Sequence, residues 1–376
     1  HEYFHNWTGN RITCRDWFQL CLKEGFTVYR DQEFSADTRS KAVQRIGQVR
    51  GLKAGQFPED AGPLAHPVRP SAYKEINNFY TATVYQKGAE LVRMLATIVG
   101  PKQFRAATDL YFKRHDGQAA VMEDFVRCFE EVAGRDLTQF MRWYAQAGTP
   151  KVSVRKEWNA HGGTLTLTFR QSTPATPGQS EKLPVPIPIR LGLLNAAGED
   201  MPLTSESAAI TDDVVLLTEE STRVVFSGLA ERPVLSLLRR FSAPVMIEHS
   251  EDSAAVVHRA RHDSDLFNRW QALNGAVSTA VGDRYAGEQH SETEARLVDA
   301  LTSVAFDTSI ENAFTAQALS LPSEHDIARM IGKDIDADAV HSASHGFATA
   351  VGAALGDAGL RRVAELRAAE AGMDDL

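Results

Sequence analysis

Hydrophobic residues follow three successive patterns along this chain. Up to about residue 150, apolar side chains recur at helical spacing, as in "CRDWFQLCLKEGF", "TVYQKGAELVRMLATIVG" and "EDFVRCFEEVAG". The later segments "KVSVRKEW", "TLTLTFRQ" and "VVLLTEE" alternate between apolar and polar residues or are rich in β-branched ones, which is typical of strands. From about Ser250 the helical period returns, as in "ETEARLVDALTSVA".

These patterns predict a multidomain α+β fold. Residues 1–150 are expected to form a helical region, 151–248 a small β-sandwich, and 249–376 an α-helical domain of helix pairs. A sandwich suits the middle region because its short strands are separated by turn segments such as "NAHGG" and "NAAGED". A chain of 376 residues is long enough for two or three such domains.

Composition narrows the range of partners and compartments. The chain has 40 basic and 49 acidic residues and a formal net charge of -9, which argues against nucleic acid or an anionic membrane as its main partner. No apolar run reaches the length of a membrane span, so we expect no membrane partner. The cysteines Cys14, Cys21 and Cys128 form no CxxC motif, which favours a reducing compartment. We therefore expect a cytoplasmic protein, with a monomer as its simplest state.

The first five residues, "HEYFH", carry the clearest chemical signal. On a helix, His1 and His5 differ by only about 40° in direction and about 6 Å in rise. Both imidazoles can therefore reach one zinc ion at about 2.0–2.1 Å. Glu2 lies between them, where a carboxylate can face the same cavity without being a ligand. The HExxH motif thus predicts a metal site with an adjacent base.

Two histidines need a third protein ligand to complete a catalytic zinc site. His5 and Glu24 are separated by 18 residues, which leaves room for a turn and a second, antiparallel helix. A carboxylate on that second helix would complete a His₂Glu ligand set. Taken alone, Glu24 could equally be a solvated helix residue; its spacing from the HExxH motif favours the ligand interpretation.

Three segments together resemble a known family. "HEYFHNWTGNRIT", "WFQLCLKEG" and "TVYQKGAE" are similar to the gluzincin aminopeptidases related to aminopeptidase N, and most similar to their bacterial alanyl aminopeptidase branch. The resemblance implies that residues 1–150 are the helical part of a thermolysin-like zinc peptidase domain. It also implies a hydrolase of the membrane alanyl aminopeptidase type, which holds one zinc ion per chain and removes N-terminal residues from peptides with a free N-terminus.

The resemblance assigns roles to individual residues. His1, His5 and Glu24 would bind zinc, and Glu2 would be the general base for the water that zinc activates. Tyr85, in "TVYQKGAE", would donate a hydrogen bond to the oxyanion of the tetrahedral intermediate. Without the resemblance, Tyr85 would be interpreted as a core aromatic residue at the start of a helix.

Two further residues are candidates for support of the ligands. Asp31 could accept the second ring N–H of a ligating histidine, although a solvent-facing carboxylate explains it equally well. Lys23 could lie beside Glu24, although a solvated lysine is the simpler interpretation.

Some family features do not occur in this sequence, and other functions compete. The family binds the substrate's amino group with a Gly-x-Met-Glu-Asn segment, and no such string is present. We therefore expect a truncated chain that by itself binds zinc weakly and has little activity. Within metallohydrolases, a thermolysin-like endopeptidase or a bifunctional enzyme of the leukotriene-hydrolase type could use the same ligands. A non-catalytic binding or scaffold module is the alternative from another class.

Overall fold

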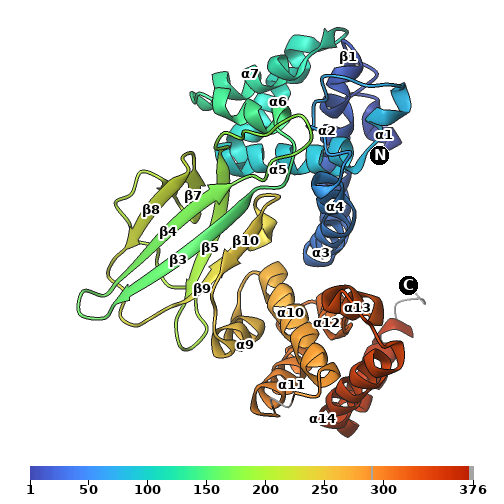
Figure 1. Ribbon diagram of the computed structural model, residues 1–376, viewed down its shortest axis with the longest axis vertical. Coiled ribbons are helices and arrows are strands. Elements are labelled where there is room, and N and C mark those ends of the chain that lie inside the picture. The colour runs from blue at the N-terminus through green and yellow to red at the C-terminus, as the bar shows by residue number, and fades with distance from the viewer. Residues whose placement is uncertain (289–290, 372–376) are drawn as a thin grey trace. The chain divides into compact units, whose positions relative to one another are not determined.

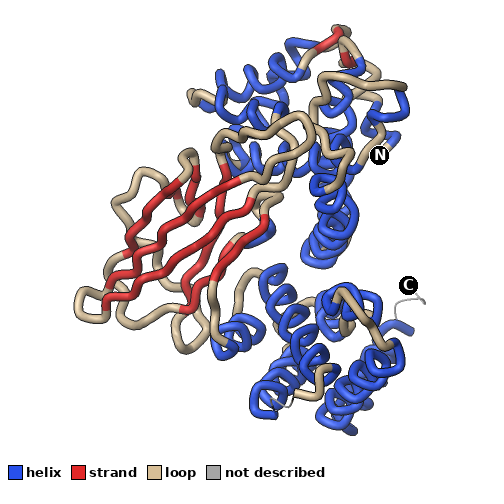
Figure 2. Tube along the Cα trace, in the orientation of Figure 1, coloured by secondary structure: helices blue, strands red, loops and turns tan. Residues whose placement is uncertain are grey.

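The computed structural model describes residues 1–288 and 291–371, which belong to two compact units (Figures 1 and 2). The first unit comprises residues 1–193, 201–233 and 237–250. The second comprises residues 194–200, 234–236 and the described residues from Glu251 onward. Each unit is described by itself below.

The first part of the first unit is helical. Its longer helices are α2 (Leu20–Thr38), α3 (Lys41–Gly51), α5 (Gly88–Val99), α6 (Pro101–His115) and α7 (Met122–Ala133). Its shorter helical elements are α1 (Glu2–His5), η1 (Trp17–Gln19), η2 (Leu52–Gln56), α4 (Phe57–Ala61), η3 (Ile76–Phe79), η4 (Thr83–Lys87), η5 (Thr138–Met141) and α8 (Arg142–Ala145). Two short strands, β1 (Thr13–Cys14) and β2 (Ala119–Ala120), pair in parallel.

Helices α2 and α5 approach each other at a pair of glycines. A Cβ atom added to Gly25 would lie 2.8 Å from the carbonyl carbon of Gly88, and one added to Gly88 would lie 3.2 Å from Cα of Gly25. Side chains larger than hydrogen cannot fit between these backbones without a shift. The two glycines directly follow the segments that carry Glu24 and Tyr85, so this contact brings the two predicted site residues together.

A buried ion pair connects α3 and α5 with the segment around Phe241. The Arg45 guanidinium donates to both carboxylate oxygens of Glu90, at 2.7 and 2.6 Å, and to the backbone carbonyl of Phe241 at 2.9 Å. Burial alone would raise the pKa of Glu90, but the charge and hydrogen bonds of Arg45 outweigh it and hold that pKa below its ordinary value. A buried carboxylate is thus kept ionised and fully bonded.

The rest of the first unit is a sandwich of short strands. Its elements are β3 (Lys151–Asn159), β4 (Thr164–Ser172), β5 (Ile187–Leu194), β6 (Ile210–Thr211), β7 (Val214–Leu217), β8 (Ser221–Phe226), η6 (Arg239–Phe241) and β10 (Met246–His249). Strand β9 (Val234–Leu237) lies between β8 and η6 in the chain, and its residues 234–236 belong to the second unit. One sheet has the order β10-β3-β4-β8, and the other contains β6, β7 and β5 side by side. Burial alternates along β4, where Leu165, Leu167 and Phe169 face the core, as expected for a sheet with one covered face.

The second unit is helical. Its helices are α9 (Ser253–His262), α10 (Leu266–Tyr285), α11 (Ser291–Phe306), α12 (Asn312–Leu319), α13 (Glu324–Ile331) and α14 (Ala337–Ala371). The side chains of Asp252 and Asp265 cap the first two of these helices by accepting hydrogen bonds from backbone N–H groups. Among the helices that the structure describes, none is long and apolar enough to cross a membrane.

The observed order of a helical region, a sandwich and a second helical region confirms the predicted multidomain α+β fold. The boundaries at residues 150 and 248 stay predictions.

The glycine contact yields a stability prediction. Gly25→Ala places a methyl group against the backbone of α5, so we expect the free energy of unfolding to fall by about 1–3 kcal/mol, measured by urea titration. Gly47→Ala is the matched control, because Gly47 also lies within a helix but has open space around the position of a Cβ atom. That variant should gain up to about 1 kcal/mol from its higher helix propensity. Equal stability of the two variants would contradict the close contact.

Candidate metal centre

The predicted ligands His1 and His5 flank a single helical turn. His1 is the N-cap of α1, and the Nε2 atoms of the two imidazoles are 3.0 Å apart, with the rings nearly perpendicular. Both side chains are partly exposed, His1 to 27% and His5 to 12%. The two nitrogens therefore face a common point that solvent can reach.

Glu24, from the buried first part of α2, faces the same point. Its Oε2 lies 3.3 Å from His1 Nε2 and 3.2 Å from His5 Nε2, and its side chain is only 4% exposed. Ligand atoms that lie about 2.0–2.1 Å from a tetrahedral ion are about 3.3–3.4 Å apart, close to the edges of this triangle. Two imidazole nitrogens and one carboxylate oxygen at this spacing fit the donor set of a zinc site that keeps a position open.

Lys23 holds the other oxygen of the same carboxylate. Its Nζ is 2.5 Å from Glu24 Oε1, so the two oxygens of Glu24 have different partners. The charge of Lys23 also balances part of the negative charge of a carboxylate that is removed from water. Lys23 therefore lies beside Glu24 and forms an ion pair with it, while its role as a support of the ligand stays a prediction.

Glu2 and Tyr85 border the triangle of donor atoms. Ligand-type atoms of Glu2, His1 and His5 all lie within 4.8 Å of one another, and Glu2 is exposed. Tyr85 lies in the π-helical turn η4, with its ring 6.4 Å from that of His1 and nearly parallel to it. Burial of the Tyr85 hydroxyl and the neighbouring Glu24 carboxylate raise the pKa of Tyr85 above its ordinary value. The hydroxyl is thus protonated at neutral pH and can donate a hydrogen bond.

At His5, residues other than Asp31 contact the second ring nitrogen. His5 Nδ1 donates to the backbone carbonyl of Thr8 at 2.8 Å and lies 3.3 Å from Thr27 Oγ1. Within the described chain, no hydrogen bond or ion pair joins Asp31 to His1 or His5. A carbonyl and a hydroxyl thus take the place of the expected carboxylate at this ring.

Thr8 and Thr27 were not among the residues that the sequence pointed to. Thr27 follows Glu24 by three positions, so the two side chains lie on one face of α2, and this spacing could have indicated a supporting residue. For Thr8 no comparable signal exists in the sequence. Tyr80 was also missed; its ring lies 6.2 Å from that of Tyr85, and about half of its surface is exposed.

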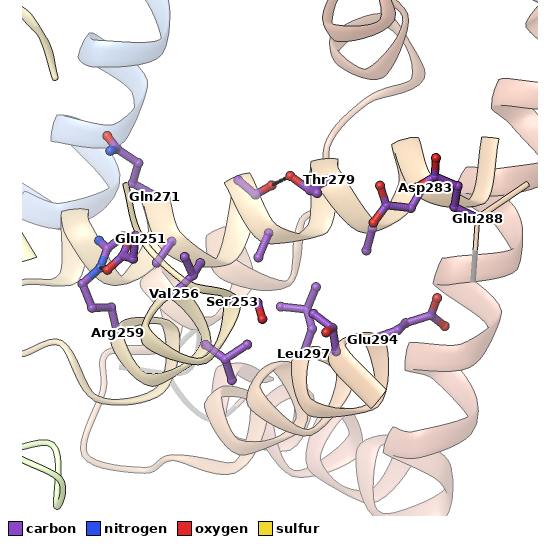
Figure 3. A pocket seen from close by; sticks show the side chains of 16 residues that line it. Glu251, Ser253, Val256, Arg259, Gln271, Thr279, Asp283, Glu288, Glu294 and Leu297 are labelled. Atoms are coloured by element: carbon purple, nitrogen blue, oxygen red, sulfur yellow. Dashed lines mark hydrogen bonds and ion pairs between the residues drawn. The ribbon is translucent and has the colours of Figure 1, made fainter. Parts of the chain in front are cut away.

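A separate cavity of about 430 Å³ lies within the second unit, between α9, α10 and α11 (Figure 3). Apolar side chains such as Val256 and Leu297 line part of it, and Glu251 forms an ion pair with Arg259 at its edge. None of the predicted site residues lines this cavity. The chemistry expected from the sequence therefore belongs to the first unit alone.

Comparisons with known proteins agree with the arrangement of parts. Residues 1–144 match the Peptidase family M1 domain, residues 148–250 a domain of unknown function (DUF3458) with an Ig-like fold, and residues 253–375 its C-terminal companion with ARM repeats. The Legionella pneumophila aminopeptidase A, solved in complex with aspartic acid, superimposes with a TM-score of 0.78 and 28% identity, over 94% of this chain and 38% of that one.

Curated relatives give the same family. The chain is 52% identical over 363 residues to aminopeptidase N of Caulobacter vibrioides, a match that covers 96% of this chain and 41% of the relative. It is 44% identical over 333 residues to aminopeptidase N of Escherichia coli, covering 88% of this chain and 38% of the relative. The chain thus spans about two fifths of the length of these relatives. Its first 144 residues thus belong to the Peptidase family M1 domain, and over most of its length the chain is similar to part of the bacterial aminopeptidases N.

Proposed function

We propose that this chain carries the zinc site of an aminopeptidase that removes N-terminal residues from peptides. The observation that supports this most strongly is the triangle of donor atoms, in which Glu24 Oε2 lies 3.3 and 3.2 Å from the Nε2 atoms of His1 and His5. These are the atoms that a His₂Glu zinc site requires, supplied by two separate helices. The names of the relatives support the exopeptidase assignment.

His1, His5 and Glu24 would hold the ion. When bound, zinc supplies a Lewis acid that makes a water nucleophilic at neutral pH and polarises the carbonyl of the scissile bond. Lys23 keeps Oε1 of Glu24 occupied, which leaves Oε2 directed at the two imidazoles. Because Nδ1 of His5 donates to the Thr8 carbonyl, Nε2 is the nitrogen whose lone pair the neutral ring would offer to zinc.

The exposed Glu2 would act as the base. Its carboxylate lies close enough to the histidines to take a proton from the attacking water and to pass it to the leaving amine. The protonated Tyr85 hydroxyl would donate a hydrogen bond to the oxyanion that forms on the substrate carbonyl. Peptides with a free N-terminus are the proposed substrates, while a cytoplasmic location and a monomeric state stay predictions.

The reaction class is tested with matched substrates. The zinc-loaded protein, at its natural length, should hydrolyse alanyl amides and leave the N-acetylated alanyl amide uncleaved. Removal of zinc by a chelator should abolish hydrolysis, and added zinc should restore it. Comparable cleavage of the N-acetylated substrate would favour an endopeptidase, and activity that survives complete zinc removal would overturn the proposal.

The role of Glu2 is tested by Glu2→Gln, which removes the base but keeps the size of the side chain. We expect kcat for the alanyl amide to fall by about 10²–10⁴-fold, while the zinc affinity changes little because Glu2 is not a ligand. Asp109→Asn is the control, because Asp109 is an exposed carboxylate paired with Arg105 on the surface of α6. A Glu2→Gln variant with the kcat of the control would contradict the assignment of the base.

A further inference from the structure

The ligand-bearing helix α1 cannot hold its own position. It has four residues, no side-chain cap and no buried residue, and a helix this short is unstable in water without outside contacts. Phe4 packs its ring under the guanidinium of Arg30, 4.6 Å from the ring centre, which fixes the backbone of the turn. That contact does not determine which way the imidazole of His5 points.

A pair of buried threonines contacts the far side of that imidazole. Thr8 is 3% exposed and Thr27 is fully buried, and their Oγ1 atoms are 2.6 Å apart. Thr8 follows α1, whereas Thr27 lies on α2 one turn after Glu24. The contact therefore joins the segment that carries two predicted ligands to the helix that carries the third.

The hydroxyl protons of this cluster can be arranged so that every polar group has a partner. Each hydroxyl has a single proton to donate, and the Thr8 hydroxyl donates to the backbone carbonyl of Phe4 at 3.2 Å. In this arrangement the Thr27 hydroxyl donates to Thr8 Oγ1 across the 2.6 Å contact, and the Thr8 carbonyl, 3.4 Å away, is its other acceptor. The Thr8 carbonyl, 2.8 Å from His5 Nδ1, accepts the proton of that nitrogen, so Nε2 is the nitrogen left to bind a metal ion.

We propose that Thr8 and Thr27 are positioning residues whose hydroxyl groups join the α1 turn to α2, a contact called the hydroxyl latch below. By holding His5 in place, this latch sets the affinity of the site for zinc. The inference rests on the proposed zinc site and extends it to residues that touch no substrate. The latch acts in two ways. It keeps the Thr8 carbonyl under His5 Nδ1, which fixes the tautomer, and it holds the spacing between His5 and Glu24.

Thr27→Val tests the latch with a change of one functional group. Valine has nearly the shape of threonine but cannot donate to Thr8, so we expect the zinc dissociation constant of the 376-residue chain to rise about 10–100-fold in chelator competition. Thr27→Ser restores the hydroxyl and should bring the affinity to within about threefold of the wild-type value. Because the latch works as one unit, Thr8→Val combined with Thr27→Val should weaken binding little more than Thr27→Val alone.

Controls separate the latch from general loss of structure. Thr97→Val removes a hydroxyl that donates to the carbonyl of Arg93 within α5, and it should leave zinc affinity unchanged. Thermal unfolding of the zinc-free proteins shows whether Thr27→Val remains folded. If it unfolds, Thr27→Ser carries the test, because an affinity well below that of the wild type in a folded serine variant would overturn the latch.

The outcomes also distinguish the latch from the proposed function. A wild-type chain that binds zinc together with a folded Thr27→Val variant of equal affinity would refute the latch and leave the zinc site standing. A folded wild-type chain that binds no zinc would refute both. Weaker binding by Thr27→Val, rescue by Thr27→Ser and no effect of Thr97→Val would support the latch.

Discussion

The close approach of α2 and α5 at Gly25 and Gly88 is the constraint on which the candidate site depends. With 2.8 Å between the Gly88 carbonyl carbon and the position of a Cβ on Gly25, only two glycines allow the backbones to come this near. Glu24 directly precedes one glycine, and Tyr85 lies three residues before the other. The carboxylate and the phenol therefore reach the same point because of how two helices pack.

The site joins one rigid and one weakly supported element. Glu24 belongs to a 19-residue helix whose first part is buried, whereas His1 and His5 belong to a single turn without buried residues. Zinc sites lose affinity when the residues behind the ligands do not hold them in place. In the proposed arrangement, Lys23 supports Glu24 within α2, and the contact of Thr8 with Thr27 supports His5 by joining the α1 segment to α2.

The sequence predicted those parts of the site that depend on local spacing. His1 and His5 are four residues apart on one turn, and the interval to Glu24 fits a second helix, so the three donors could be found without a structure. The same kind of pattern, apolar residues with period 3.6 or 2, predicted the order of helical, sandwich and helical regions.

The partner of His5 Nδ1 could not be predicted in this way. The Thr8–Thr27 contact depends on how two segments pack, and a carboxylate such as Asp31 is the more usual partner of a ligating histidine. The ion pair of Lys23 with Glu24 could not be predicted either. Lys23 is next to Glu24 in the sequence, but the direction of its side chain depends on packing.

The proposed function depends on the binding of one zinc ion by His1, His5 and Glu24 together. X-ray absorption at the zinc edge of the zinc-loaded 376-residue chain, combined with elemental analysis, tests it most directly. We expect one zinc per chain, with a coordination shell of nitrogen and oxygen atoms at about 2.0–2.1 Å that includes two imidazoles, and we expect Glu24→Ala to lose this signal. A shell that contains sulfur at about 2.3 Å, or a full complement of zinc in Glu24→Ala, would contradict it.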